Sequence, residues 1–213
     1  MTRTEMVARI MELLGFRTDS RTENVVLQQL PIQQLRIEQG ATKPWFLLGE
    51  YASYPTTANE ERVPVPEDFI SEHDEDGLAI YNAEEERYVT LVKNDLDELR
   101  GIYKDTEPGL PEAYALAGGY FRLFPTPDDA YVVRMLYYAK EAQLTNGGDS
   151  NKFTTQFPEL LMGMTGLRAA QILRDAAAQT VFREMLAEAR AEMYRQNELR
   201  NHSNASYQIG GQH

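Results

Sequence analysis

The chain contains no cysteine and only three histidines, His73, His202 and His213. The absence of cysteine excludes disulfides, thiolate metal sites and thiol nucleophiles. No histidine has a metal-binding partner three or four residues along the chain, the spacing that brings two side chains onto one helix face. We therefore expect no metal centre, no cofactor and no catalytic histidine or cysteine.

Long apolar runs and known catalytic motifs are also missing. No stretch of about 18 apolar residues occurs, and the opening segment alternates polar with apolar residues, so we expect no membrane span, no secretion signal and a cytosolic product. There is no Walker-type, GxSxG or GxGxxG motif. The best match to a calcium loop starts at Glu72 and puts Ala83 at the last ligand position, where glutamate is required. The sequence predicts a protein that is not an enzyme.

Positive charge is scarce in one region. The formal net charge is -12, and residues 60–107 hold 16 Asp or Glu against five Lys or Arg. Such a field repels nucleic acid, which disfavours a sequence reader or a nuclease. Two interpretations stay open: a solvated surface that aids solubility, or an acidic wall along which DNA slides without sticking.

The apolar spacing predicts an α+β fold that is mainly α. We expect helices at about residues 3–15, 22–40 and 158–200, with a kink or break near Leu30 because Pro31 follows it. The last of these is either two helices that meet near residues 175–178 or one bent helix. A β-rich insertion is expected at about residues 60–140, with a short helix capped at Asn94 or Asp95. The prediction is one domain, residues 1–200, built as a helical bundle with a small antiparallel sheet, and a flexible tail, residues 201–213.

Two hairpins are expected in the insertion. Asp76-Gly77 is a two-residue turn signal. The second hairpin, "YFRLF" followed by "AYVVRMLYY", would turn at residues 125–129, and both of its faces are largely apolar. One face should pack on the domain, and the other on a helix or on another chain. Trp45 is open to two roles, a core aromatic or an anchor for a partner.

Four segments occur in an order that resembles the head-to-tail adaptor (connector or neck) proteins of tailed bacteriophages. They are "PWFLL" at residues 44–48, "VPVPEDFI" at 63–70, "PEAYALAGGYFRLFPTPDDAYVVRMLYY" at 111–138 and "FPELLMGMTGLRAAQILRD" at 157–175. The resemblance extends from about Glu5 to Arg200. Its most specific part is the aromatic stretch 124–138, followed at a set distance by the helix start at 157–161.

The resemblance implies a structural protein of the virion neck, made in the cytoplasm of the host bacterium. Such proteins form a homo-oligomeric ring, typically of twelve subunits, that extends the DNA channel below the portal and attaches tail or nozzle proteins. Genomic double-stranded DNA would pass through the lumen without specific binding, and no membrane is involved. In similar adaptors the C-terminal segment docks onto the portal. The resemblance therefore implies that portal contact is made by Asn201, Asn204, Tyr207, Ile209 and His213.

The aromatic hairpin suits burial between neighbouring subunits of such a ring. The residues assigned to this subunit interface are Tyr120, Phe124, Tyr131 and Tyr137. Two alternatives compete with the adaptor. One is an acidic interaction or regulatory protein, such as a DNA mimic; the other is a metal enzyme built on acidic pairs such as Glu67-Asp68 or Asp95-Asp97.

Overall fold

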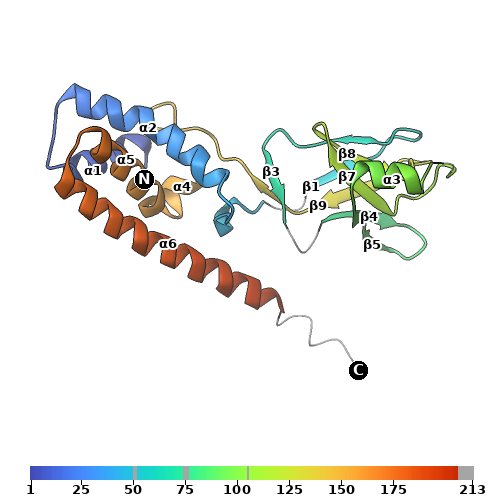
Figure 1. Cartoon of the computed structure of the whole chain (residues 1–213). Helices are drawn as coiled ribbons and strands as arrows, with labels where there is room; N and C mark the ends of the chain where they lie inside the picture. The colour runs from blue at the N-terminus through green and yellow to red at the C-terminus, as the bar shows by residue number, and fades with distance from the viewer. Residues whose placement is uncertain (50–51, 74–76, 105, 206–213) are drawn as a thin grey trace. The chain divides into compact units, whose positions relative to one another are not determined.

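A computed structural model gives the structure of residues 1–49, 52–73, 77–104 and 106–205, with the side chains of these residues up to Arg200 except that of Ala52. The chain divides into two compact units. The helical unit combines Met1–Leu47 with Glu141–His213, and the β unit consists of Leu48–Lys140. Figure 1 labels the elements of both units. The chain is therefore a mixed α+β protein.

The helical unit begins with α1 (Arg3–Leu13), whose start follows from its sequence. Thr2 and Glu5 form a capping box: the Thr2 hydroxyl accepts from the Glu5 backbone N–H, and the Glu5 carboxylate accepts from the Thr2 backbone N–H. Met6, Val7 and Ile10 are buried at helical spacing. This agrees with the helix predicted from residue 3.

The second helix, α2 (Ser20–Glu38), runs through Pro31 without ending. Proline removes one backbone donor from a helix interior. Here Leu30 and Gln34 are fully buried on either side of Pro31. The packing of this face outweighs the lost hydrogen bond, so the break considered near Leu30 does not occur. A short 3-10 helix, η1 (Trp45–Leu47), follows.

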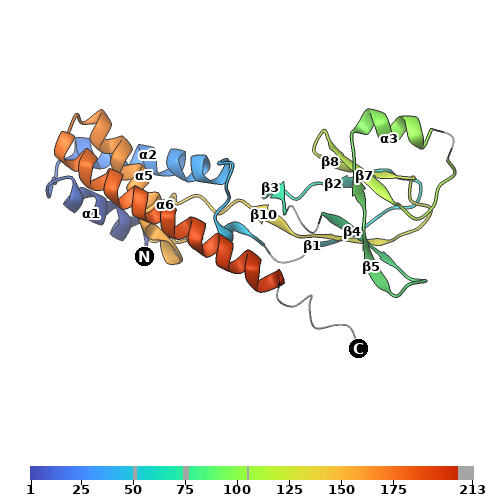
Figure 2. The same cartoon turned by 60° about the horizontal axis from the view of Figure 1, so that its bottom comes forward.

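The C-terminal part consists of α4 (Lys152–Thr155), α5 (Pro158–Ile172) and α6 (Ala176–Ala205). The alternative of one long bent helix is wrong. Arg174 adopts a φ of 56°, and Asp175 accepts from the Ala178 backbone N–H at 3.0 Å, so a new helix is capped there. Figures 1 and 2 place α5 between α2 and α6, and both of these helices contact it.

The β unit contains two four-stranded sheets and one strand pair. The first sheet has the order β1 (Ala52–Pro55), β9 (Val132–Met135), β4 (Leu78–Asn82), β5 (Arg87–Thr90). The second has the order β2 (Arg62–Pro64), β8 (Tyr120–Phe124), β7 (Ala113–Ala117), β6 (Val92–Lys93). The pair joins β3 (Phe69–Glu72) to β10 (Tyr137–Ala139). Every pairing is antiparallel except that of β6 with β7.

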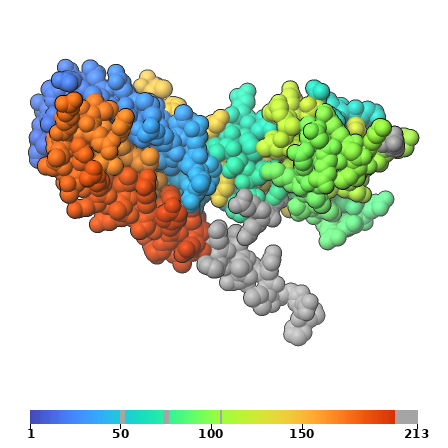
Figure 3. Space-filling model, viewed as in Figure 1, coloured from blue at the N-terminus to red at the C-terminus, as the bar shows by residue number. Residues whose placement is uncertain are grey.

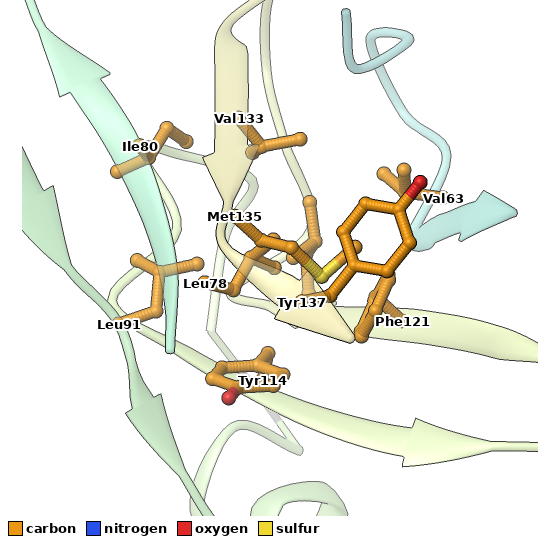
Figure 4. Close-up of a cluster of buried hydrophobic side chains, with 10 residues drawn as sticks. Val63, Leu78, Ile80, Leu91, Tyr114, Phe121, Val133, Met135 and Tyr137 are labelled. Atoms are coloured by element: carbon orange, nitrogen blue, oxygen red, sulfur yellow. The ribbon is translucent and has the colours of Figure 1, made fainter. Parts of the chain in front are cut away.

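Both sheets contribute to one apolar core. Leu78, Ile80, Val133 and Met135 come from the first sheet, and they pack with residues of the second, such as Phe121. Figure 4 shows these side chains converging between the strands. The core residues alternate along β9 as the sequence predicts, because successive side chains of a strand point to opposite faces.

The other face of β8 is covered by a helix. Phe124 packs with Leu99, Ala113 and Ala115 in a second cluster beneath α3 (Leu96–Ile102). The cap of α3 is confirmed at Asp95, whose carboxylate accepts from the Asp97 backbone N–H at 2.9 Å. Both faces of β8 are therefore covered in part within the β unit. The element that packs over Phe124 is a helix.

The predicted hairpin of "YFRLF" with "AYVVRMLYY" does not form. Strand β8 pairs with β7 and β2, whereas β9 pairs with β1 and β4, so residues 125–131 connect two sheets. Around Asp76-Gly77, β3 pairs with β10 while β4 pairs with β5 and β9; Asp76 itself lies outside the described residues. Closeness in the sequence therefore did not identify the pairing partners of β8 and β9.

Candidate interaction surfaces

The predicted portal-docking segment begins inside a helix. Asn201 and Asn204 lie in the last turns of α6, which extends to Ala205 instead of ending at residue 200. Tyr207, Ile209 and His213 lie outside the described residues. The segment predicted to dock onto the portal therefore starts as a continuation of α6.

Residues 197–200 of α6 are anchored to residues 43–45, where η1 begins. The Asn197 side chain donates to the Lys43 carbonyl oxygen at 2.9 Å and accepts from the Trp45 backbone N–H at 2.9 Å. The Arg200 guanidinium carbon lies 3.6 Å from the centroid of the Trp45 ring, a cation–π contact. Three contacts thus hold the last described turns of α6 against residues 43–45.

The Trp45 ring is contacted by one aromatic and one charged side chain of the same chain. Its ring meets Phe46 edge-on at 5.6 Å, and Phe46 meets the buried Phe153 at 5.1 Å. The indole is only partly buried, and its open face carries Arg200. These contacts are made within the chain, and the role of Trp45 as an anchor for a partner stays a prediction. Sequence reasoning missed the Asn197–Trp45–Arg200 group, because Trp45 is about 150 residues from the other two and the three follow no motif.

The four aromatic residues assigned to a subunit interface differ in exposure. Tyr120 is 39% exposed, and Tyr131 is partly buried. Phe124 (6% exposed) packs under α3, and Tyr137 (8%) packs in the core between the sheets. Tyr120 is thus the member of this set with the most surface to offer another subunit.

Two arginine side chains lie near the ring of Tyr120. The guanidinium carbons of Arg62 and Arg122 each lie 5.9 Å from the centroid of its ring. Arg122 also forms an ion pair with Glu61. Other exposed apolar side chains of the β unit include Leu116 (40%) and Val132 (41%). The outer surfaces of the β unit therefore keep some apolar and aromatic character.

Two of the predicted interface tyrosines are hydrogen-bonded to carboxylates. The Tyr131 hydroxyl donates to Asp128 Oδ1 at 2.5 Å, and this bond, together with burial, raises the pKa of Tyr131 to about 12. The Tyr137 hydroxyl donates to Asp68 Oδ1 at 2.9 Å. Burial first, and then the Asp68 carboxylate, raise the pKa of Tyr137. Both hydroxyls remain protonated donors at neutral pH.

Several carboxylates of the acidic region have local structural roles. Asp95 caps α3, and Asp68 accepts from Tyr137. Glu72 forms an ion pair with Lys93, and Glu85 pairs with Arg87 at 2.5 Å. Within the described ranges, no three His, Asp or Glu side chains lie close enough together to hold a metal ion. Nor does any helix in those ranges have the length and apolar character needed to cross a bilayer.

Comparison with known proteins agrees with the order of segments in the sequence. A search of curated protein sequences finds no match to the chain. The model of the SU10 adaptor protein family matches residues 1–208, which include both units and all of α6. Over this length the chain belongs to the SU10 adaptor protein family, a family of phage head–tail adaptors.

Proposed function

We propose that the chain is a structural subunit of the phage neck, where copies of it form a ring below the portal, extend the DNA channel and attach the tail. The observation that carries this proposal is the family match over residues 1–208. In this proposal residues 1–200 act as one adaptor domain, residues 201–213 act as its docking tail, and the ring contains twelve copies. The subunit works by binding and catalyses no reaction.

The anchored end of α6 supports a role for the C-terminal tail in docking. A flexible segment that orders on a partner loses conformational entropy, and this weakens binding. Asn197 and Arg200 hold the base of the tail against residues 43–45 before any partner arrives. The entropy loss is then confined to the residues that follow, among which Tyr207 and Ile209 supply apolar side chains for the portal.

The β unit is proposed to contact neighbouring subunits and tail proteins. Tyr120, with Arg62 and Arg122 beside its ring, combines residue types that are enriched at binding hot spots. Tyr131 adds a partly exposed ring. Phe124 and Tyr137 support this surface from beneath, because their side chains are buried in the β unit.

Passage of DNA without specific binding is consistent with the charge of the chain. Tight non-specific binding of DNA requires lysine and arginine side chains that neutralise phosphates. The chain carries a net charge of -12. A lumen built from such subunits would release DNA readily during packaging and ejection.

Portal binding is tested with purified portal rings of the same phage and the full-length chain, with masses measured by mass photometry. We expect portal complexes to gain a ring of adaptor subunits. A chain ending at Ala205 keeps all of α6 and should lose most of its affinity for the portal. Tyr207→Phe is the matched control and should bind as the full chain does.

The outcomes separate the parts of the proposal. If the chain ending at Ala205 joins the portal with unchanged affinity, residues 206–213 are not the docking segment. If the full chain neither self-assembles nor joins the portal at any concentration tested, the proposed function is wrong.

A further inference from the structure

The helix pair α5–α6 carries charges of opposite sign on its two sides. On one side a groove is lined by Phe157, Glu159, Met185, Glu188, Ala189 and Glu192. Its floor is apolar, its rim has three carboxylates, and no lysine or arginine lines it. We call this surface the acidic flank.

A second groove has the reverse charge. Its rim includes Arg36 and Arg190, its floor includes Ile37, Met164 and Met193, and no carboxylate lines it. Tyr194 stands at its edge with 50% of its surface exposed. We call this surface the basic flank.

The geometry of α6 puts the two flanks on opposite sides. Consecutive residues of an α-helix are about 100° apart, so Arg190 points roughly 200° away from Glu188. Between these directions, on the side facing α5, lies the buried stripe Phe182, Leu186, Ala189 and Met193. The basic flank also includes residues of α2, whereas the acidic flank is formed by α6 and the start of α5 alone. Figure 3 shows that the outer side of α6, coloured orange to red, is not covered by another element in that view.

Most of these charges form no ion pair with another described residue. Glu192 is paired with Arg195 at 2.6 Å. Among the residues that the structure describes, Glu159 and Glu188 form no ion pair, and neither do Arg36 and Arg190. Each flank thus presents an apolar floor with unpaired charges, and the charges on one flank complement those on the other.

We propose that the acidic flank of one copy binds the basic flank of the next copy. Tyr194 of one subunit seats its ring on Phe157, Met185 and Ala189 of its neighbour, and Arg190 lies against Glu188. This inference rests on the proposed ring and identifies the surfaces that close it. Because the two flanks are different surfaces on opposite sides, the contact is heterologous, and repetition of a heterologous contact generates a ring when the rotation closes.

The residue types fit this contact. Tyrosine and arginine are enriched at the centres of interfaces, where an aromatic ring fills an apolar pocket and flanking charges exclude wrong partners. Since the charges lie at a partly exposed rim, salt screens them over about 8–10 Å at ordinary ionic strength. Assembly through the flanks should therefore weaken as the salt concentration rises.

The test uses charge reversal on a single helix. Glu188→Arg turns the acidic rim toward positive charge, and Arg190→Glu reverses the basic rim. Each variant alone places like charges against each other at every contact of the ring. We expect assembly, followed by mass photometry alone and on portal rings, to need about tenfold or more protein than the unmodified chain needs.

The decisive measurement is made on an equal mixture of the two variants. In an alternating ring, the reversed acidic flank of Glu188→Arg meets the reversed basic flank of Arg190→Glu, and the unmodified flanks meet each other. The mixture should therefore assemble as the unmodified chain does, in rings with an even number of copies. Glu184→Arg is the matched control: the residue lies one turn before Glu188 on the exposed side of α6 and lines neither groove. It should assemble normally.

Three results would decide against the inference. Normal assembly of both single variants shows that the flanks do not meet, while the proposed function stands. The same conclusion follows if the single variants fail and their mixture stays unassembled although both are folded by circular dichroism. If the unmodified chain forms no oligomer, alone or on the portal, the proposed function fails and this inference fails with it.

Discussion

The close approach of α5 and α6 at Gly166 makes a sharp test of the packing. A Cβ atom added to Gly166 would lie 2.1, 2.3 and 2.4 Å from three carbons of the Phe182 ring. Carbon atoms in contact normally sit about 3.5–4.0 Å apart, so the ring would have to move by more than about 1 Å. Phe182 is fully buried, and its movement would disturb the surrounding core.

Two effects of Gly166→Ala oppose each other. Alanine in place of glycine in a helix interior stabilises by about 1 kcal/mol. Overpacking a well-filled core costs about 1–3 kcal/mol and occasionally more. Because the added Cβ overlaps three ring atoms, we expect the overpacking cost to lie toward the upper end of its range. The net loss in the free energy of unfolding should then be roughly 1–2 kcal/mol.

Urea unfolding followed by the fluorescence of Trp45, the single tryptophan of the chain, reports on the helical unit. Ala191→Gly, at an exposed position of α6, measures the helix-propensity effect in the same unit and should cost about 1 kcal/mol. In a Phe182→Leu background, Gly166→Ala should cost less, because the smaller side chain leaves room. If Gly166→Ala stabilises the unit by as much as Ala191→Gly destabilises it, the close approach at Gly166 is wrong.

Two further predictions concern single side chains. Asn197→Ala removes both hydrogen bonds to residues 43–45, so we expect the free energy of local unfolding to fall by about 1–2 kcal/mol and amide hydrogen exchange in residues 190–200 to become faster. Asn197→Asp keeps the acceptor oxygen and should lose less protection. Unchanged protection in both variants would contradict the anchoring. The pKa of Tyr131 is about 12 in the folded state, above its ordinary value of 10.0, so the stability that this group contributes is fully present below about pH 10 and is lost as the pH rises toward 12. Asp128→Asn should lower this pKa, and titration of tyrosinate absorbance would show it; identical titration curves for the two proteins would refute the assignment.

Local features of the fold could be predicted because they depend on near neighbours. The helix predicted from residue 3 is α1, and Asp95, one of the two predicted cap positions, begins α3. The alternation of Val133 and Met135 with their neighbours shows which face of β9 is buried. Cysteine content and the excess of carboxylates excluded thiol chemistry and disfavoured tight DNA binding without any coordinates.

The candidate surfaces were accessible from the sequence only in part. The order of aromatic, proline and helix segments predicted the family, and the family match bears this out. The sequence could not show that Phe124 is covered by α3, since either a helix or another chain would satisfy an apolar face. Nor could it show that Asn197 and Trp45 meet.

By itself, the sequence determined which side chains are apolar at helical or strand spacing, where the helices can begin, and the sign of the charge on the chain. Only the tertiary structure decided which elements meet: β8 and β9 in different sheets, Gln34 hydrogen-bonded to Asn151 at 3.2 Å, and opposite charges on the two sides of α5–α6. The physical reason is that periodicity specifies the face that an element buries, whereas its partner is selected by packing between segments far apart in the chain.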